Sequence, residues 1–304
     1  MAAVGALCTG RLISAASLLT FPQMPSSAPA LALLLDRRFT VITGKGGVGK
    51  SSVTVNLAQV LAGRGLQVGV LDADLQGPSV AKMMGLRGSP VRVEGGDRLL
   101  PTPGPCGVLV QSMDFFLQGS QALDWDGADG AGTTLRSVFE QSALADLLGQ
   151  TRWGALDTLL VDLPPGADRL PALAQWLPDS LGEALIVTIP TEVALLAVER
   201  SIRRAYDLNF PLLGVVENLG TGRCSECGQE VAWLGQAPTE PWAQGLGLEC
   251  VVRIPFDPLL WQAADGGESF LQTTAADSEA VLAFQALADH VMRAERPGRE
   301  GESS

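Results

Sequence analysis

The segment from Gly44 to Ser51 constrains the fold of this 304-residue chain more than any other feature. It reads Gly-Lys-Gly-Gly-Val-Gly-Lys-Ser and stands between an apolar run typical of a buried strand and a segment of helical period. Glycines at these spacings let successive backbone N–H groups turn toward a phosphate, and the helix that begins there adds a favourable dipole. The segment therefore predicts a phosphate-binding loop between a strand and a helix.

Two lysines and a serine give this loop its expected chemistry. Lys50 is expected to reach the β and γ phosphates of a nucleotide, and Ser51 to ligate magnesium through its hydroxyl. Lys45 is not required by the general pattern, and the chain has only one other lysine, Lys82. We expect Lys45 and Lys50 to take part in hydrolysis, and we expect the nucleotide to contact Gly44, Lys45, Gly46, Gly47, Val48, Gly49, Lys50, Ser51 and Ser52.

Three aspartates follow strand-like runs at positions from which they can meet this loop. Asp72 ends one apolar run, Asp74 follows two residues later, and Asp162 ends the run Leu159-Leu160-Val161. Ligands bind open α/β sheets beyond the carboxyl ends of the strands, so these carboxylates are expected at one magnesium–phosphate centre. We expect Asp72 and Asp162 near the metal ion and Asp74 to orient the attacking water. Taken singly, each could instead end a strand or cap a helix.

Apolar runs alternate with segments of helical period from residue 37 onward. Most of the runs are apolar throughout, which is typical of strands buried on both faces. The pattern predicts an α/β fold, a doubly wound and mostly parallel sheet flanked by helices. The predicted strands are Phe39–Thr43, Val68–Asp72, Val108–Met113, Thr158–Asp162, Ala184–Ile189, Leu212–Glu217 and Val251–Ile254, and the predicted helices are Lys50–Arg64, Leu135–Leu148, Val193–Leu208 and Ser278–Arg293.

Stretches of different composition divide the chain. Residues 1–36 carry Arg11 as the one charged side chain before Asp36 and predict a disordered or targeting extension, and residues 295–304 predict a disordered tail. The ATPase domain is expected over 37–294. Within it we expect a mobile loop at 114–132 and an irregular insert at 219–245.

Charge and cysteine usage limit the partners and the compartment. The chain has 21 basic and 33 acidic residues, for a net charge of −12, which argues against nucleic-acid and membrane partners. The terminal helix could suit a membrane surface, but its acidic polar face favours packing on the core. Five cysteines make no disulfide framework and predict a reducing compartment, the cytoplasm. If residues 1–36 are a transit peptide, the location is instead a mitochondrion or plastid.

Cys224 and Cys227 form a CxxC pair inside the insert. A zinc site or an iron-sulfur cluster normally takes four protein ligands, and this motif supplies two. Two copies from a symmetric dimer would supply four. Three alternatives stay open at this point: cluster ligands, structural zinc, and a redox dithiol or incidental pair.

The loop lysine and the motifs around it resemble known ATPases. A lysine at the position of Lys45 is typical of the MinD, ParA and nitrogenase-iron-protein group of dimerising ATPases. Within that group the chain resembles the Mrp/ApbC family of iron-sulfur cluster carriers from about Arg37 to Arg293. The segments that carry this resemblance are Asp72-Ala73-Asp74-Leu75-Gln76-Gly77-Pro78-Ser79, Trp153-Gly154-Ala155-Leu156-Asp157, Asp162-Leu163-Pro164-Pro165-Gly166, Val216-Glu217-Asn218, Ile254-Pro255-Phe256-Asp257-Pro258 and the CxxC pair.

The resemblance implies a homodimer that sandwiches two ATP molecules, with Lys45 reaching across to the partner's nucleotide. It also implies a labile 4Fe-4S cluster bridging two subunits through Cys224 and Cys227 and delivered to apo-proteins, with cluster assembly factors as further partners. ATP hydrolysis would be slow, with Mg²⁺ at the phosphates and Asn218 at the adenine.

Three motifs depart from the family pattern. Ser225 stands where the family usually has proline, Gly166-Ala167-Asp168 replaces a longer Gly-Thr-Gly-Asp run, and Thr188-Ile189-Pro190-Thr191 replaces Thr-Thr-Pro-Gln. The alternative function is a MinD- or ParA-like positioning switch that dimerises with ATP. Electron transfer by a nitrogenase-reductase-like protein is a third, although those relatives place their two ligands on separate segments.

Overall fold

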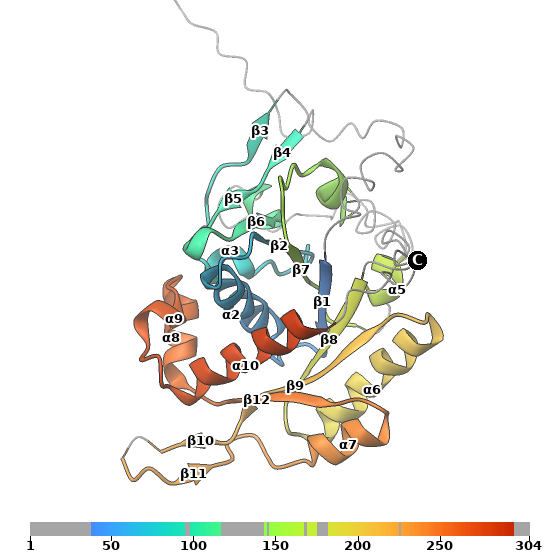
Figure 1. Ribbon diagram of the computed structural model, residues 1–304, viewed down its shortest axis with the longest axis vertical. Helices are drawn as coiled ribbons and strands as arrows, with labels where there is room; N and C mark the ends of the chain where they lie inside the picture. Colours follow the sequence, from blue (N-terminus) through green and yellow to red (C-terminus); the bar gives the residue numbers. More distant parts are fainter. Residues whose placement is uncertain are drawn as a thin grey trace, which may run out of the picture.

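The computed structural model describes residues 38–94, 98–116, 143–144, 146–166, 169–174, 182–224 and 226–294. The largest sheet has eight strands in the order β12-β9-β8-β1-β7-β2-β6-β5, and every neighbouring pair runs parallel except β5 with β6 (Figure 1). Its strands are β1 Arg38–Gly44, β2 Val68–Asp72, β5 Thr102–Pro103, β6 Leu109–Ser112, β7 Thr158–Asp162, β8 Gly182–Thr188, β9 Leu212–Gly220 and β12 Cys250–Pro255.

Two short hairpins and a set of helices complete the described fold. The hairpins pair β3 Arg92–Glu94 with β4 Arg98–Leu100, and β10 Gly222–Arg223 with β11 Glu230–Val231. The helices are α2 Lys50–Gly63, α3 Val80–Met83, α5 Arg169–Ala174, α6 Glu192–Asp207, α7 Thr239–Gly245, α8 Pro258–Gly266, α9 Phe270–Thr273 and α10 Glu279–Arg293, with 3-10 turns η2 Pro105–Gly107 and η3 Met113–Phe116.

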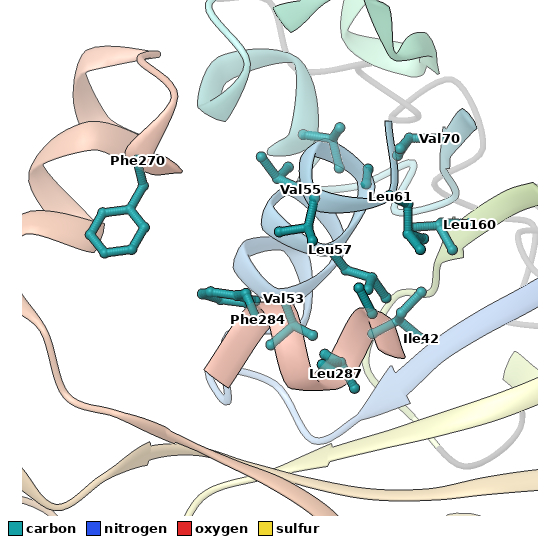
Figure 2. Close-up of a cluster of buried hydrophobic side chains, with 14 of the residues drawn as sticks. Ile42, Val53, Val55, Leu57, Leu61, Val70, Leu160, Phe270, Phe284 and Leu287 are labelled. Carbon is teal, nitrogen blue, oxygen red and sulfur yellow. The ribbon is translucent and has the colours of Figure 1, made fainter. Parts of the chain in front are cut away.

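Helices cover both faces of the large sheet. On one face α2 packs on β1, β2 and β7 and contacts α10, and α3, α8 and α9 complete this layer. Figure 2 shows its apolar cluster, which includes Leu57 and Leu61 of α2, Ile42 of β1 and Phe284 of α10. On the other face lie α5, α6, α7 and helical residues 146–150. The central strands are buried from both sides, which explains their continuous apolar runs.

The predicted doubly wound fold is confirmed, and the predicted strands shift by no more than a few residues at their ends. The predicted helix Leu135–Leu148 is helical in its described part, and residues 135–142 lie outside the described residues. The N-terminal extension 1–36, the tail 295–304 and the loop residues 117–132 also lie outside them. Among the described residues, no helix has the length and apolar character needed to span a membrane.

The prediction of an irregular insert at 219–245 is wrong in part. Strand β9 continues to Gly220, and the insert contains the β10–β11 hairpin and helix α7. The hairpin strands have two residues each, too few for alternation of polar and apolar residues to show in the sequence. Helix α8 was also missed by the sequence-based prediction. Its start is recognisable, because the Asp257 side chain caps the helix by accepting from the Leu259 N–H, and Pro258 occupies the first helical position.

A buried ion pair at the edge of the core predicts a pH-dependent stability. Glu183 lies 2.6 Å from Arg38, which also donates to the carbonyls of Val291 and Ala294 at the end of α10. Burial raises the pKa of Glu183 from 4.5 to about 7, against the opposing effect of Arg38. The folded protein therefore holds this proton more tightly than the unfolded chain does, so stability is lost as pH rises from about 4.5 to about 7.

We expect Glu183→Gln to remove this dependence of stability on pH. The free energy of unfolding of the unsubstituted protein, minus that of Glu183→Gln, should fall by roughly 1–3 kcal/mol between those pH values. The measurement is urea unfolding at a series of pH values. The control is Glu94→Gln, because Glu94 forms an exposed ion pair with Arg152 and should show no such slope. A difference that rises with pH would contradict the assignment.

Candidate functional site

The loop from Gly44 to Lys50 joins β1 to α2 with a backbone that only glycine permits at two positions. A Cβ on Gly44 would lie 2.2 Å from the Val187 carbonyl oxygen. Gly49 precedes α2 with a φ of 83°, in the left-handed region, and a Cβ there would lie 2.3 Å from Asn218 Nδ2. The absence of side chains at Gly44 and Gly49 thus lets the loop lie directly against β8 and β9.

The two loop lysines occupy different environments. Lys50 is buried, and its Nζ donates to the Lys45 carbonyl oxygen at 3.3 Å. Burial lowers the pKa of Lys50, and the nearby carboxylates Asp162 and Asp74 raise it in opposition. Lys45 is exposed at the tip of the loop. The arrangement places Lys50 inside the site and Lys45 on its exposed surface.

Asp162 lies at the end of β7 directly behind the loop. Ser51 Oγ donates to its Oδ2 at 2.5 Å, and Thr54 Oγ1 donates to its Oδ1 at 3.3 Å. Burial raises the pKa of Asp162 to about 6, while the Ser51 hydrogen bond and the Lys50 charge act to lower it. The hydroxyl of Ser51 and the carboxylate of Asp162 thus form one oxygen pair, the ligand type that Mg²⁺ prefers.

Asp72 is fully buried at the end of β2, in register with Asp162 on β7. Its Oδ2 accepts from the backbone N–H groups of Ser79 and Val80 and from the Ser112 hydroxyl, each at 3.1 Å, and its Oδ1 accepts from the Asp74 N–H at 3.2 Å. Burial, and next the Asp162 charge, raise the pKa of Asp72 well above its ordinary value. The carboxylate therefore braces the loop after β2.

Asp74 lies within that braced loop and is half-buried. Its Oδ1 accepts from the N–H groups of Gln76 at 3.2 Å and Gly77 at 3.0 Å. These bonds fix the orientation of the carboxylate, and its charge acts on both Lys50 and Asp162. Asp74 is thus held near Lys50 and Asp162 in a fixed orientation.

The polar groups around the loop fit a magnesium nucleotide. Among the described residues, the Thr43 hydroxyl and the Asn218 Oδ1 are buried without a hydrogen-bond partner. Thr43 lies on β1, which leads into the loop, and Asn218 lies on β9, where its Nδ2 donates to the Val48 carbonyl oxygen at 2.9 Å. Unpartnered buried polar atoms also occur elsewhere among the described residues, on Asn56 and Thr102 for example, so only the position of these two beside the loop connects them with a bound nucleotide.

The CxxC pair lies in the turn between β10 and β11. Cys224 is half-buried and Cys227 exposed, while Ser225 lies outside the described residues. The Cys224 N–H donates to Gln229 and its carbonyl accepts from Gly228, both at 2.9 Å. Backbone N–H groups of Cys227 and Glu226, and then the Cys227 side chain, lower the pKa of Cys224, which favours the thiolate.

The hairpin is tied to the rest of the fold at two points. Arg223 Nε donates to Glu279 of α10 at 2.7 Å, and its Nη1 donates to the Gly228 carbonyl oxygen at 3.4 Å. On the other side, β9 carries Asn218 against the loop, and the first strand of the hairpin begins at Gly222, four positions later. Within the described part of the chain, no group of three or more His, Cys, Asp or Glu side chains could hold a metal ion.

Comparison with known families decides the class of this site. A family model described as ParA: NUBPL iron-transfer P-loop NTPase matches residues 35–292. The chain belongs to this family. The resemblance to the Mrp/ApbC carriers, drawn from the loop and the CxxC pair, is thereby confirmed, and with it the P-loop NTPase class.

Relatives of this NUBPL-type NTPase share most of its length. The iron-sulfur cluster carrier protein of Saccharolobus solfataricus is 38% identical over 83% of this chain and 82% of its own. The protein of the same name from Methanocaldococcus jannaschii is 37% identical over 77% of each chain. The nucleotide-binding protein of Archaeoglobus fulgidus, solved in complex with ADP, is 31% identical with a TM-score of 0.66 and covers 81% of this chain and 93% of its own. Pyrococcus furiosus MinD, 24% identical over 84% of this chain and 98% of its own with a TM-score of 0.55, shares the fold.

In this NTPase the structure brings Lys50, Ser51, Asp74 and Asp162 together at one edge, as the sequence predicts. It places Cys224 and Cys227 on a separate hairpin. Thr54 and the Asp72 partner Ser112 were missed. Thr54 follows Lys50 by four positions, so both lie on one helical face, and this spacing could have identified Thr54 as a site residue. The position of Ser112 depends on the pairing of β2 with β6, which the sequence does not specify.

Proposed function

We propose that this chain is an iron-sulfur cluster carrier that works as an ATP-binding homodimer. The cluster, a 4Fe-4S unit, is the cargo: it is held between two copies by Cys224 and Cys227 of each and passed to apo-proteins. The relatives named iron-sulfur cluster carrier protein and the iron-transfer family support the carrier role. Apo iron-sulfur proteins and cluster assembly factors are the proposed partners, and the reducing cytoplasm the proposed compartment.

The loop would hold ATP with Mg²⁺, and each residue has a physical task there. Loop N–H groups and Lys50 stabilise negative charge on the phosphates, and Ser51 with Asp162 would hold the metal ion, which supplies charge neutralisation at the transferring phosphoryl group. Asp74 would orient the attacking water, and Asn218 would contact the adenine. The exposed Lys45 would reach the nucleotide of the partner copy. The expected activity is slow hydrolysis of ATP to ADP and phosphate.

The observation that carries this proposal is that one chain supplies two thiols and so only half of the usual set of four ligands. Cys224 and Cys227 are accessible, the pKa of Cys224 is lowered, and no third His, Cys, Asp or Glu joins them among the described residues. Four ligands are the usual number for zinc or a cluster, and a twofold axis near the hairpin supplies them. Structural zinc in the same four-thiolate site is the alternative.

The test is elemental analysis after anaerobic reconstitution with iron and sulfide. The double variant C224S/C227S should lose bound iron and sulfide on the order of tenfold, because serine supplies no thiolate. Cys106→Ser and Cys250→Ser are matched controls, since both cysteines are free and lie outside the motif. The controls should bind as the unsubstituted protein does.

Two results would count against the proposal. Iron and sulfide binding that is unchanged in C224S/C227S would exclude this motif as the cluster site. Purified protein that binds about one zinc per dimer and excludes iron even when both metals are supplied would favour structural zinc.

A further inference from the structure

An exposed apolar surface lies beside the thiol hairpin. The Phe256 ring packs between Trp233 and Trp261, with centroid distances of 5.6 Å and 5.3 Å. Trp233 is 52% exposed and Trp261 51%, and the neighbouring Leu234 and Leu259 are exposed as well. We define these five residues as the aromatic patch. Large side chains gathered in this way on a water-exposed surface mark an interaction site more often than a chance cluster.

The patch is attached to the base of the hairpin. Gly222, two positions before Cys224, pairs with Val231, two positions before Trp233. A Cβ on Gly222 would lie 3.3 Å from Trp233 Nε1, so the indole lies against this strand. With about 3.3 Å per strand residue, the indole lies on the order of 10 Å from the first cysteine. Phe256 and Trp261 follow the carboxyl end of β12, the same edge of the sheet that carries the phosphate-binding loop.

We infer that the aromatic patch is where a second copy of this chain docks. This inference rests on the proposed function, in which two hairpins meet around one cluster. Any chain close enough to share thiolates with Cys224 and Cys227 would also come close to surface within about 10 Å of them, which includes Trp233, and the rings of Phe256 and Trp261 extend the patch from there. The thiol turn alone is too small, because a stable interface buries about 800 Å² on each partner.

Charge leads to the same conclusion. Each copy carries a net charge of −12, and the hairpin itself contains Glu226 and Glu230, so electrostatic attraction does not draw two copies together. Burial of apolar area must then supply the affinity. Tryptophan is the residue type most often found at the energetic centre of an interface, which gives Trp233 and Trp261 the expected largest share.

The experiment measures the dimer dissociation constant by analytical ultracentrifugation, on the full chain reconstituted anaerobically with iron and sulfide and supplied with ATP. The double variant W233A/W261A should weaken the dimer by about 10- to 100-fold. W233F/W261F should dimerise nearly as the unsubstituted protein does. The matched control is Val93→Ala, which truncates another exposed side chain on β3, at the end of the molecule away from β10 and β11 (Figure 1).

The outcomes separate this inference from the proposed function. If the unsubstituted protein stays monomeric with iron and sulfide bound, the proposed function itself fails. If it dimerises and W233A/W261A dimerises equally well, the patch inference alone is overturned. If W233A/W261A keeps the dimer and its cluster but loses transfer to an apo-ferredoxin, the patch binds the acceptor and the inference is again overturned.

Discussion

Replacing Lys50 by Met should abolish ATP hydrolysis, with a loss of at least about 100-fold in kcat. Lys50 is the buried lysine of the loop and the one proposed to contact the phosphates, and burial lowers its pKa. Met has a similar length and no charge, so the fold should survive while phosphate stabilisation is lost. Phosphate release measures the rate, and titration with a fluorescent ATP analogue measures the affinity, which should fall about tenfold or more.

The other two lysines make the controls. Lys45→Met should leave nucleotide affinity nearly unchanged and lose hydrolysis, because Lys45 is exposed and is proposed to act on the partner copy's nucleotide. Lys82→Met should change neither, since Lys82 is exposed on α3. Hydrolysis by Lys50→Met at the unsubstituted rate would contradict the proposed phosphate role. Normal hydrolysis by Lys45→Met would contradict a reach across the dimer.

The nucleotide half of the site could be predicted because its residues are close in sequence or end predicted strands. The spacing of residues from Gly44 to Ser51 determines the local conformation of the loop. A parallel sheet brings Asp72 and Asp162 to the same edge, where the structure places them in register. The order of the strands was not predicted, because parallel crossovers of similar length are compatible with several orders.

The surroundings of the cysteines could not be predicted in the same way. The CxxC spacing identifies two thiols, but the tether from Arg223 to Glu279 joins segments 56 positions apart. The contact between the Trp233 and Phe256 rings likewise depends on where β12 ends relative to the hairpin. Such contacts follow from tertiary packing, which a pattern of hydrophobic residues along the chain does not contain.

The sequence and the structure suggest different main roles for Asp72. The expectation is a carboxylate near the metal ion, yet both of its oxygens already accept hydrogen bonds, from Asp74, Ser79, Val80 and Ser112. A carboxylate that satisfies four donors is a structural brace first. Its removal would leave three N–H groups and a hydroxyl without partners in the interior.

Asp72→Ala should therefore lower the free energy of unfolding by about 3–5 kcal/mol. Urea unfolding measures this, and Asp74→Ala is the control, because Asp74 accepts two N–H groups in a half-buried loop and should cost about 1 kcal/mol. The two variants should also separate in function: Asp74→Ala should lose hydrolysis while remaining folded. If Asp72→Ala unfolds at the same urea concentration as the unsubstituted protein but needs far more Mg²⁺ for hydrolysis, the carboxylate serves the metal ion rather than the loop.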